Sequence, residues 1–227
     1  MKISSNSEKK LIGTRAHRVD KLYEIAPGVY MLSIERLFDF IPGQVVALSV
    51  EENDPSPRIY SICSGNDEAV ISVLFIVVQG GKLTTKLAGL EKGDTVYCSS
   101  PYGSFFGDES PAYWIASGTG IAPYISMLRS GMGKNKVLIH GGRNRESFYF
   151  SDELLREMPG RYIRCSSKEK GDDLYEGRLT SYLNEKEELE SGYRYYLCGS
   201  AGMVVEARDI LIEKGVPYNN IFSEIYF

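Results

Sequence analysis

The sequence predicts two domains, an antiparallel β-barrel followed by an α/β domain built on a parallel sheet. Three observations support this fold class. The first half consists of short apolar segments separated by turn residues, which is typical of a small barrel. The second half alternates strand-like and helix-like segments, which favours a parallel sheet with helices on both faces. Between them, residues 107–111 read as a polar linker. We therefore expect domains at residues 1–108 and 109–227.

The first half of the chain holds the segments expected to form the barrel. Its strand candidates are rich in apolar and β-branched residues, and Gly-rich or charged breaks separate them. A Pro42-Gly43 turn divides the first two strands, and a helix is expected directly after Gly80-Gly81. The expected strands are residues 29–34, 45–50, 59–63, 69–78 and 95–99, and the expected helix is residues 82–88.

The second half holds the segments expected to form the α/β domain. Strand-like and helix-like segments alternate there. Gly215 is placed to end the last helix. The expected strands are residues 112–116, 136–140, 162–165, 194–198 and 221–225, and the expected helices are residues 123–129, 152–157, 179–188 and 203–214.

Composition indicates an ordinary globular protein and disfavours several classes. Of 227 residues, 43% are hydrophobic and 25% are charged, close to the usual values of about 45–50% and about 25%. The net charge of −4 argues weakly against nucleic-acid binding. The four cysteines lack Cys-x-x-Cys spacing and there are two histidines, so no metal site is expected. No apolar run reaches the roughly 18 residues of a bilayer span, and residues 1–10 lack a signal-peptide core. The expected location is the cytoplasm, without membrane insertion.

One strand candidate carries an unusual set of functional groups. Arg58-Ile59-Tyr60-Ser61 places a cation, an aromatic ring and a hydroxyl within four residues. A guanidinium offers a planar fork of donors to a pyrophosphate, and a phenol packs on a flat ring while keeping a polar edge. The alternative is a half-buried strand with an exposed arginine, which this segment alone would favour.

Two glycine segments suit phosphate groups. Gly80-Gly81-Lys82-Leu83-Thr84 opens a helix whose first turn offers free N–H groups and hydroxyls. Gly118-Thr119-Gly120 follows an apolar strand and leads to Pro123, which suits the first turn of a helix. Both segments can instead be ordinary strand-to-helix turns. The position of the second segment, after the first strand of the α/β half, favours nucleotide binding.

Two further segments lie near the carboxyl terminus. Cys198-Gly199 ends a predicted strand and could place a thiol beside the contents of a cleft; the alternative is a buried structural cysteine. The chain closes with Glu224, Tyr226 and Phe227, and these residues alone favour a last strand docked on the core.

Together, and in this order, these segments resemble the ferredoxin–NADP⁺ reductase superfamily over about residues 15–227. The resemblance implies an FAD-binding barrel followed by an NADP-binding α/β domain. It assigns Arg58, Tyr60 and Ser61 to the flavin, and the segment from Gly81 to Thr84 to its pyrophosphate. Pro101, Gly103 and Phe105 resemble the family's turn before the domain boundary, although Cys63 stands where the family usually has alanine.

The resemblance also assigns roles in the reaction. Gly118 to Pro123 would hold the pyridine nucleotide, and Cys198 would lie beside the nicotinamide. Ser61 would bond the flavin near its reactive nitrogen, and Glu224 would tune charge or relay a proton through Ser61. Tyr226, or else Phe227, would lie flat against the flavin and move aside for the nicotinamide.

A preference for NADPH over NADH is expected from one charged segment. Ser167-Lys168-Glu169 resembles the family's 2′-phosphate motif, with Lys168 in place of arginine. His140-Gly141-Gly142-Arg143 resembles a bacterial variant, so Arg143 or Arg145 could supply a cation. Phe150 stands near the position of the aromatic that stacks on adenine. A solvated charged loop is the alternative.

The expected function is electron transfer between NADPH and a one-electron carrier through FAD. Because the chain lacks a cysteine set for a [2Fe–2S] cluster, a separate ferredoxin or flavodoxin is the expected partner. The alternatives are an NADH-dependent reductase that feeds an oxygenase or a cytochrome, a flavin- or nucleotide-binding regulatory subunit without turnover, and a protein whose glycine loops are only structural.

Overall fold

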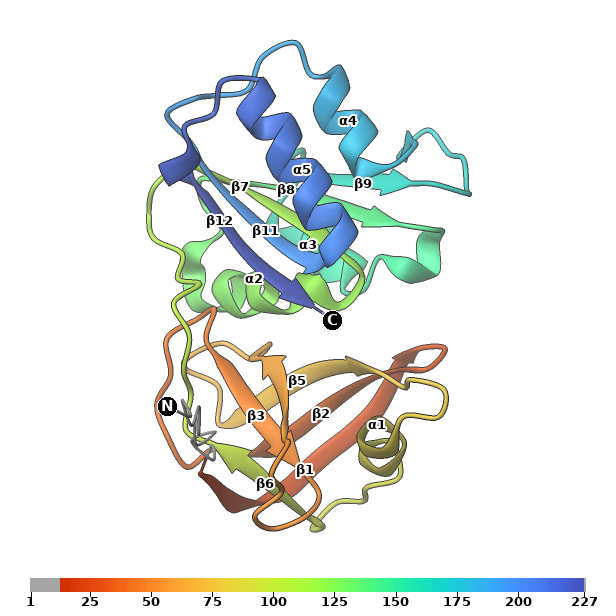
Figure 1. The fold of residues 1–227 in the computed structure, drawn as a ribbon. Coiled ribbons are helices and arrows are strands. Elements are labelled where there is room, and N and C mark those ends of the chain that lie inside the picture. The colour runs from red at the N-terminus through yellow and green to blue at the C-terminus, as the bar shows by residue number, and fades with distance from the viewer. Residues whose placement is uncertain (1–12, 227) are drawn as a thin grey trace, which may run out of the picture.

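The computed structural model describes residues 13–226 as two stacked domains (Figure 1). A sheet of antiparallel strands forms the lower domain, and a parallel sheet flanked by helices forms the upper one. The last strand of the chain ends between them. The predicted fold class is therefore confirmed.

The lower domain is a six-stranded antiparallel barrel with strand order β4-β3-β6-β1-β2-β5. A bridge between Ile62 and Val73 brings the two ends of this order together. Helix α1 (Lys82–Leu87) packs on the barrel core through Leu83 and Leu87. The strands are β1 (Thr14–Ala26), β2 (Val29–Glu35), β3 (Val45–Ser49), β4 (Arg58–Ser61), β5 (Val70–Ile76) and β6 (Thr95–Ser99).

The upper domain is a six-stranded parallel sheet with strand order β10-β9-β8-β7-β11-β12. Its first strand, β7, lies in the interior of the sheet, so the chain reverses direction along the sheet beside it. The strands are β7 (Ala112–Ser117), β8 (Lys136–Gly142), β9 (Tyr162–Ser166), β10 (Tyr175–Glu176), β11 (Arg194–Ser200) and β12 (Ile221–Tyr226). A reversal of this kind opens a crevice at the carboxyl ends of the strands, where ligands bind in such sheets.

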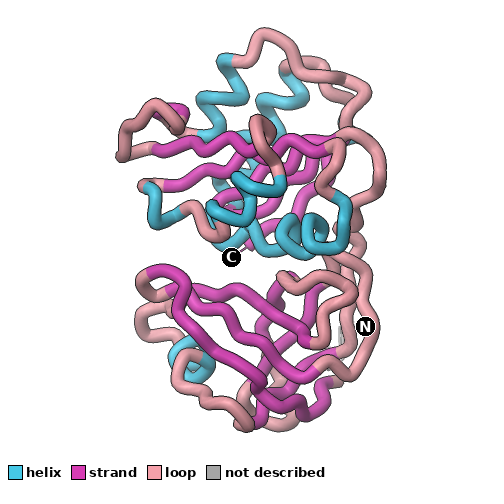
Figure 2. The backbone as a smooth tube through the Cα atoms, turned by 180° about the vertical axis from the view of Figure 1, so that it is seen from behind, coloured by secondary structure: helices cyan, strands magenta, loops and turns pink. Residues whose placement is uncertain are grey.

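Helices cover both faces of the parallel sheet (Figures 1 and 2). Helices α2 (Ala122–Met127) and α3 (Ser151–Glu157) share a core with the side chains of Trp114 and Leu138. On the other face, α4 (Leu179–Glu185) and α5 (Ala201–Glu213) share a core with Ile115 and Ile139. This arrangement confirms the alternation of strands and helices that the sequence predicts. Each helix of the described chain is too short or too polar to cross a bilayer.

One hydrophobic core crosses the seam between the domains. Val29, Met31 and Leu74 of the barrel belong to the same cluster as Trp114 and Tyr124 of the upper domain. The packing therefore joins the two domains through apolar side chains, which are the main source of stability in a protein interior.

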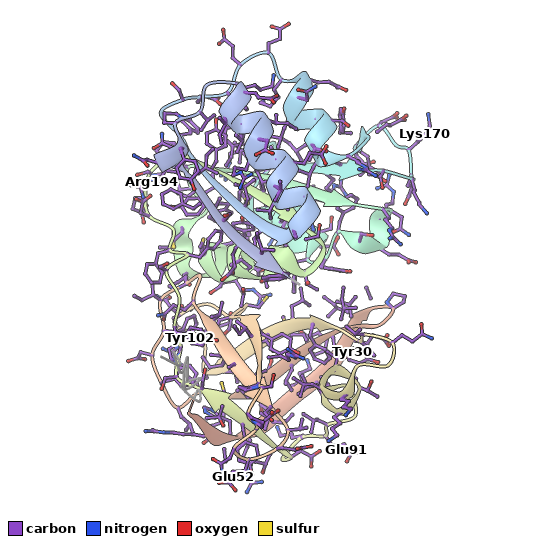
Figure 3. The ribbon with its side chains drawn as sticks, in the orientation of Figure 1. Tyr30, Glu52, Glu91, Tyr102, Lys170 and Arg194 are labelled. Carbon is purple, nitrogen blue, oxygen red and sulfur yellow. The ribbon has the colours of Figure 1, made fainter. Side chains whose placement is uncertain are left out.

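Two cations hold the segment that connects the domains. The buried Lys136 ammonium donates to the carbonyls of Asp108 and Ser110, at 2.8 Å each. Arg194, labelled in Figure 3 on the upper domain, forms an ion pair with the Asp108 carboxylate. Both cations lie at the amino ends of sheet strands, so they attach the connecting segment at the end of the sheet opposite the crevice.

Candidate active site

A cleft of about 860 Å³ lies at the carboxyl ends of the parallel strands. Backbone and side chains from the ends of β7, β8, β9 and β11 line it, as expected for a reversal point in a parallel sheet. Six predicted site residues line this cleft: Gly118, Thr119, Arg143, Ser167, Gly199 and Tyr226.

Glycines let backbone approach backbone at one end of the cleft. Gly118 has a φ of +56° and leads directly from β7 into the turn before α2. A Cβ at Gly120 would overlap the carbonyl of Cys198, and a Cβ at Gly199 would overlap the Ser117 hydroxyl. The predicted Gly118–Pro123 loop is therefore packed against β11, and Pro123 lies in the first turn of α2. The backbone amides of a glycine loop before a helix suit the oxygens of a pyrophosphate.

Two guanidinium groups in the cleft are unpaired. Arg143 and Arg178 both line it, and neither forms a salt bridge within residues 13–226. Arg145 is different, because both of its amino nitrogens donate to the Asp173 carboxylate at 2.6 and 2.8 Å. Lys168 is not among the lining residues. Arg143 and Arg178 are thus the cations of the cleft that remain available to an anionic ligand.

Sequence reasoning missed several residues of the cleft. Arg178 is the clearest, since it lies at the start of α4 without a capping bond from its side chain. A cation at the positive end of a helix is unfavourable, so its presence there could have signalled an anion site. The other residues that the prediction omitted include Ile76, Ser147, Tyr149, Thr180 and Met203.

Tyr149 and Phe150 are both partly buried against the hydrophobic core of α2 and α3, and of the two only Tyr149 lines the cleft. Tyr149, one residue before the one that the sequence suggested, is therefore one of two aromatic residues in the lining, and Tyr226 is the other.

A cluster of polar side chains joins the barrel to the upper domain. The Ser61 hydroxyl of β4 donates to the Glu224 carboxylate at 2.9 Å, and the Tyr226 hydroxyl donates to Ser61 Oγ at 2.5 Å. The Cys198 thiol lies 4.0 Å from the same Glu224 oxygen. Cys198 and Glu224 are register partners on β11 and β12. All four residues predicted to act in the reaction therefore meet here, while Phe227 lies outside the described residues.

Burial sets the protonation of this cluster. Burial raises the pKa of the Glu224 carboxyl, and the bond from Ser61 opposes this shift. Burial and the nearby Glu224 hold the pKa of the Cys198 thiol well above its usual range, so the thiol stays protonated. Because the thiolate is the reactive form of cysteine, Cys198 is suited to packing against a ligand and not to nucleophilic attack.

The first two residues of the flavin-type motif on β4 are exposed, whereas Tyr60 packs on the barrel core and Ser61 is buried. Arg58 is exposed and forms no ion pair or side-chain hydrogen bond with the described residues, and Ile59 is 58% exposed. The Tyr60 ring packs edge-on against Phe75 at a centroid distance of 6.4 Å, and burial raises the pKa of its phenol to about 12. This strand therefore presents a neutral ring beside a free cation.

The second glycine segment stands at the start of α1. Gly80 has a φ of +74°, and a Cβ at Gly81 would come within 2.9 Å of the Val78 carbonyl and 3.0 Å of Thr84 Oγ1. Thr84 Oγ1 accepts a bond from the Val78 amide at 3.0 Å, so its own proton remains free to donate. The first turn of α1 has no side-chain cap. Lys82 is exposed, and Leu83 packs on the barrel.

Comparisons with known proteins match both domains. A model of oxidoreductase FAD-binding domains matches residues 29–106, and a model of oxidoreductase NAD-binding domains matches residues 114–209. A probable electron transfer subunit of dihydroorotate dehydrogenase B (NAD⁺) from Methanopyrus kandleri is 31% identical over 194 residues, which cover 83% of this chain and 70% of that protein.

This chain belongs to the ferredoxin–NADP⁺ reductase superfamily.

Other members of the superfamily show its range. The flavodoxin/ferredoxin–NADP reductase of Escherichia coli is 29% identical over 219 residues, 92% of this chain and 82% of that protein. The reductase component of propane 2-monooxygenase from Mycolicibacterium goodii is 29% identical over 83% of this chain, which spans 60% of the length of that relative. A ferredoxin–NADP⁺ reductase from Neisseria gonorrhoeae, solved with FAD and NADP, shares the fold with a TM-score of 0.85, 20% identity and coverage of 94% and 99%.

Membership gives the chain an FAD-binding domain and an NAD(P)-binding domain of the oxidoreductase type, and the residues present fit an FAD. Arg58 and the uncapped first turn of α1 offer donors to a pyrophosphate. The hydroxyl of Tyr102, in the turn after β6 (Figure 3), is buried without a partner in residues 13–226. Burial, followed by the nearby Glu224, raises the pKa of Tyr102. A buried donor without a partner near Glu224 suits the polar edge of a ring system.

Proposed function

We propose that the protein transfers electrons from NADPH through FAD to a separate one-electron carrier such as a ferredoxin or flavodoxin. The observation that carries this proposal is the junction at Tyr226. This residue lines the cleft of the α/β domain, and its hydroxyl bonds Ser61 on the flavin-type strand of the barrel. A nucleotide in the cleft and a flavin on the barrel would therefore meet at one side chain.

The proposed roles of the residues follow from their surroundings. Bound FAD would supply the chemistry, since a flavin accepts a hydride and releases electrons singly. Arg58, Gly81 and Thr84 would hold its pyrophosphate, and Tyr60 would support its ring. Ser61 would pass a proton to or from Glu224 at their 2.9 Å hydrogen bond.

On the nucleotide side, Gly118, Thr119 and Gly120 would bind the pyrophosphate through their backbone amides. Cys198 would pack beside the nicotinamide as a neutral thiol. Tyr226 would cover the flavin until the nicotinamide displaces it, and this movement requires its bond to Ser61 to break. We also propose that the domains divide at residues 108 and 109, within the segment that Lys136 and Arg194 hold.

NADPH is the proposed nucleotide because two unpaired cations line the cleft. A 2′-phosphate is the group that distinguishes NADPH from NADH, and a guanidinium is well suited to bind it. Arg143 and Arg178 are the candidates, with Ser167 nearby in the lining. The predicted role of Lys168 in binding the 2′-phosphate stays a prediction.

A second candidate is an NADH-dependent reductase that feeds an oxygenase or a cytochrome. The relative from Mycolicibacterium goodii favours it, because its name is that of a monooxygenase reductase component. The unpaired Arg143 and Arg178 distinguish the candidates, since a protein specific for NADH has no anionic 2′ group to bind.

The test is to measure the flavin content of the purified protein and its reduction by NADPH and NADH side by side. We expect one non-covalent FAD per chain, and a higher kcat/KM with NADPH when ferricyanide accepts the electrons. A protein that cannot be reconstituted with any flavin would overturn the proposal. Equal efficiency with both nucleotides, or a preference for NADH, would favour the second candidate.

A further inference from the structure

A polar contact at the domain seam has no part in the proposed reaction. The barrel loop that follows β4 lies against the end of α2 and the turn Leu128–Met132. The buried Ser126 hydroxyl donates to the Ser64 carbonyl at 2.7 Å, and the Asn66 amide donates to the Ser130 hydroxyl at 3.0 Å. The loop of the first domain is thus fixed to the helix that follows the glycine loop of the second.

Arg129 lies at the centre of this contact and reaches three elements. Its guanidinium donates two bonds to the Glu153 carboxylate of α3, both at 2.8 Å. It lies 3.8 Å from the Glu68 carboxylate of the barrel loop. It also lies over the ring of Phe150, 5.4 Å from the centroid. The Arg129 side chain is 24% exposed and that of Glu153 is 22% exposed, so solvent screens this group less than an open surface pair.

Phe150 holds an unfavourable backbone conformation under this cation. Its φ is +61°, in the left-handed region that residues with a Cβ rarely adopt. Such a conformation persists only where the surroundings hold it. The Phe150 ring packs on the core of α2 and α3, and its carbonyl accepts the Leu154 amide at 2.9 Å to start α3. The preceding residue, Tyr149, lines the nucleotide cleft.

We propose that Arg129 is a positioning residue for the nucleotide. It holds Phe150 in the left-handed conformation, and this conformation directs the neighbouring Tyr149 into the wall of the cleft. Glu68 ties the arrangement to the barrel, so the attachment of the FAD-binding domain contributes to nucleotide affinity. This inference rests on the nucleotide site proposed above and adds the residues that hold one of its walls.

The test compares Arg129→Met, Tyr149→Ala and the double variant in the FAD-loaded protein. Dissociation constants for NADPH, kcat with ferricyanide, flavin content and Tm are measured for each. We expect Arg129→Met to weaken NADPH binding about tenfold, with kcat at saturation and flavin content unchanged, because residues in contact couple by this order. Arg156→Met is the matched control, since Arg156 lies on α3, the helix that carries the Arg129 partner Glu153, is 69% exposed and pairs with its neighbour Glu157.

The double variant separates positioning from general destabilisation. If Arg129 acts through Tyr149, the double variant binds NADPH no more weakly than Tyr149→Ala alone. Additive losses, or an Arg129→Met protein that binds NADPH as Arg156→Met does, would overturn the inference. A wild-type protein that binds neither nucleotide would overturn the proposed function, and this inference with it.

If Arg129→Met does not fold, Glu68→Gln provides the same test, since it removes only the charge that faces Arg129 from the barrel. We expect about twofold weaker binding of NADPH, and no further loss in the Tyr149→Ala background. An unchanged affinity in Glu68→Gln would overturn the inference.

Discussion

Glu224 is a carboxyl group whose ionisation the folded protein opposes. Burial raises its pKa above the ordinary value of 4.5, and the single bond from Ser61 offsets this only in part. The folded protein therefore binds a proton at this site more tightly than the unfolded chain does. The resulting stabilisation is complete below pH 4.5 and is lost as the pH rises through the folded pKa.

Glu224→Gln should therefore change stability in a pH-dependent way. The amide keeps a hydrogen-bond partner for Ser61 but cannot ionise, so the variant avoids the loss that the wild type suffers at higher pH. We expect a higher Tm than wild type at pH 8 and a smaller difference at pH 4.5, measured by calorimetry. A variant whose Tm falls below wild type by more at pH 8 than at pH 4.5 would show that the charged form is the favoured one.

Arg178 is the residue whose replacement tests nucleotide choice most directly. It lines the cleft at the start of α4 without a carboxylate partner in the described chain. Loss of one charge-assisted bond worth about 1.5–3 kcal/mol corresponds to a change of roughly ten- to a hundredfold. Arg178→Leu should raise the KM for NADPH by this order and leave that for NADH within about twofold. Equal changes for both nucleotides would place Arg178 at a group that they share.

At the scale of elements, the glycine loop between β7 and α2 depends on close backbone packing. A Cβ at Gly120 would overlap the Cys198 carbonyl, and neither backbone can move without shifting its strand. Gly120→Ala should destabilise the protein by about 1–3 kcal/mol, as overpacking usually does. It should also raise the KM for either nucleotide, because the loop amides move.

Urea denaturation and steady-state kinetics check this expectation. Gly192→Ala is the matched control, since a Cβ at Gly192 meets no atom within 4 Å. If Gly120→Ala unfolds at the same urea concentration as the control, the loop has room that its packing does not indicate.

Elements with strong local signals were predictable, and the others depend on tertiary contacts. The β7 strand, its glycine loop and α2 follow one another as an apolar run, a turn and a helix that begins at a proline. The strand β1 was not predicted, although it has 13 residues. Its charged side chains face solvent and only His17 and Val19 are buried, so the sequence lacks an apolar alternation. The predicted helix at 179–188 was too long, because Lys186 adopts an extended conformation after Glu185.

The candidate site divides in the same way. Motifs that are continuous in sequence, such as Arg58–Ser61, could be found by inspection. Ser61 and Glu224 are 163 residues apart, and only the family resemblance connected them before the fold did. Packing between distant segments decides that Arg178 has no carboxylate partner in the described chain. It also decides that Arg145 pairs with the carboxylates of Glu169 and Asp173. No local pattern in the sequence reports such pairings.

At the scale of the whole molecule, the two domains share one hydrophobic core across the seam. Met31 and Leu74 of the barrel pack in the cluster that contains Trp114 and Tyr124. The polar contacts of Ser126 with Ser64 reinforce this junction. Separation of the domains would expose this buried apolar surface to water, and each Å² exposed costs about 25 cal/mol of free energy. We therefore expect the domains to unfold together and not one after the other.

Leu87→Ala tests whether unfolding is shared. Leu87 is fully buried in the core of the barrel, away from the seam, and its truncation should cost about 2–5 kcal/mol. Trp114 is the single tryptophan and lies on β7 in the cluster that crosses the seam, so its fluorescence reports the packing of that cluster. Release of flavin fluorescence reports the barrel. In urea, both signals should change at one midpoint in the wild type, and Leu87→Ala should lower both midpoints equally. If the variant lowers the flavin midpoint while the Trp114 midpoint stays at the wild-type value, the seam does not couple the domains, because a loss confined to the barrel would then leave the upper domain folded.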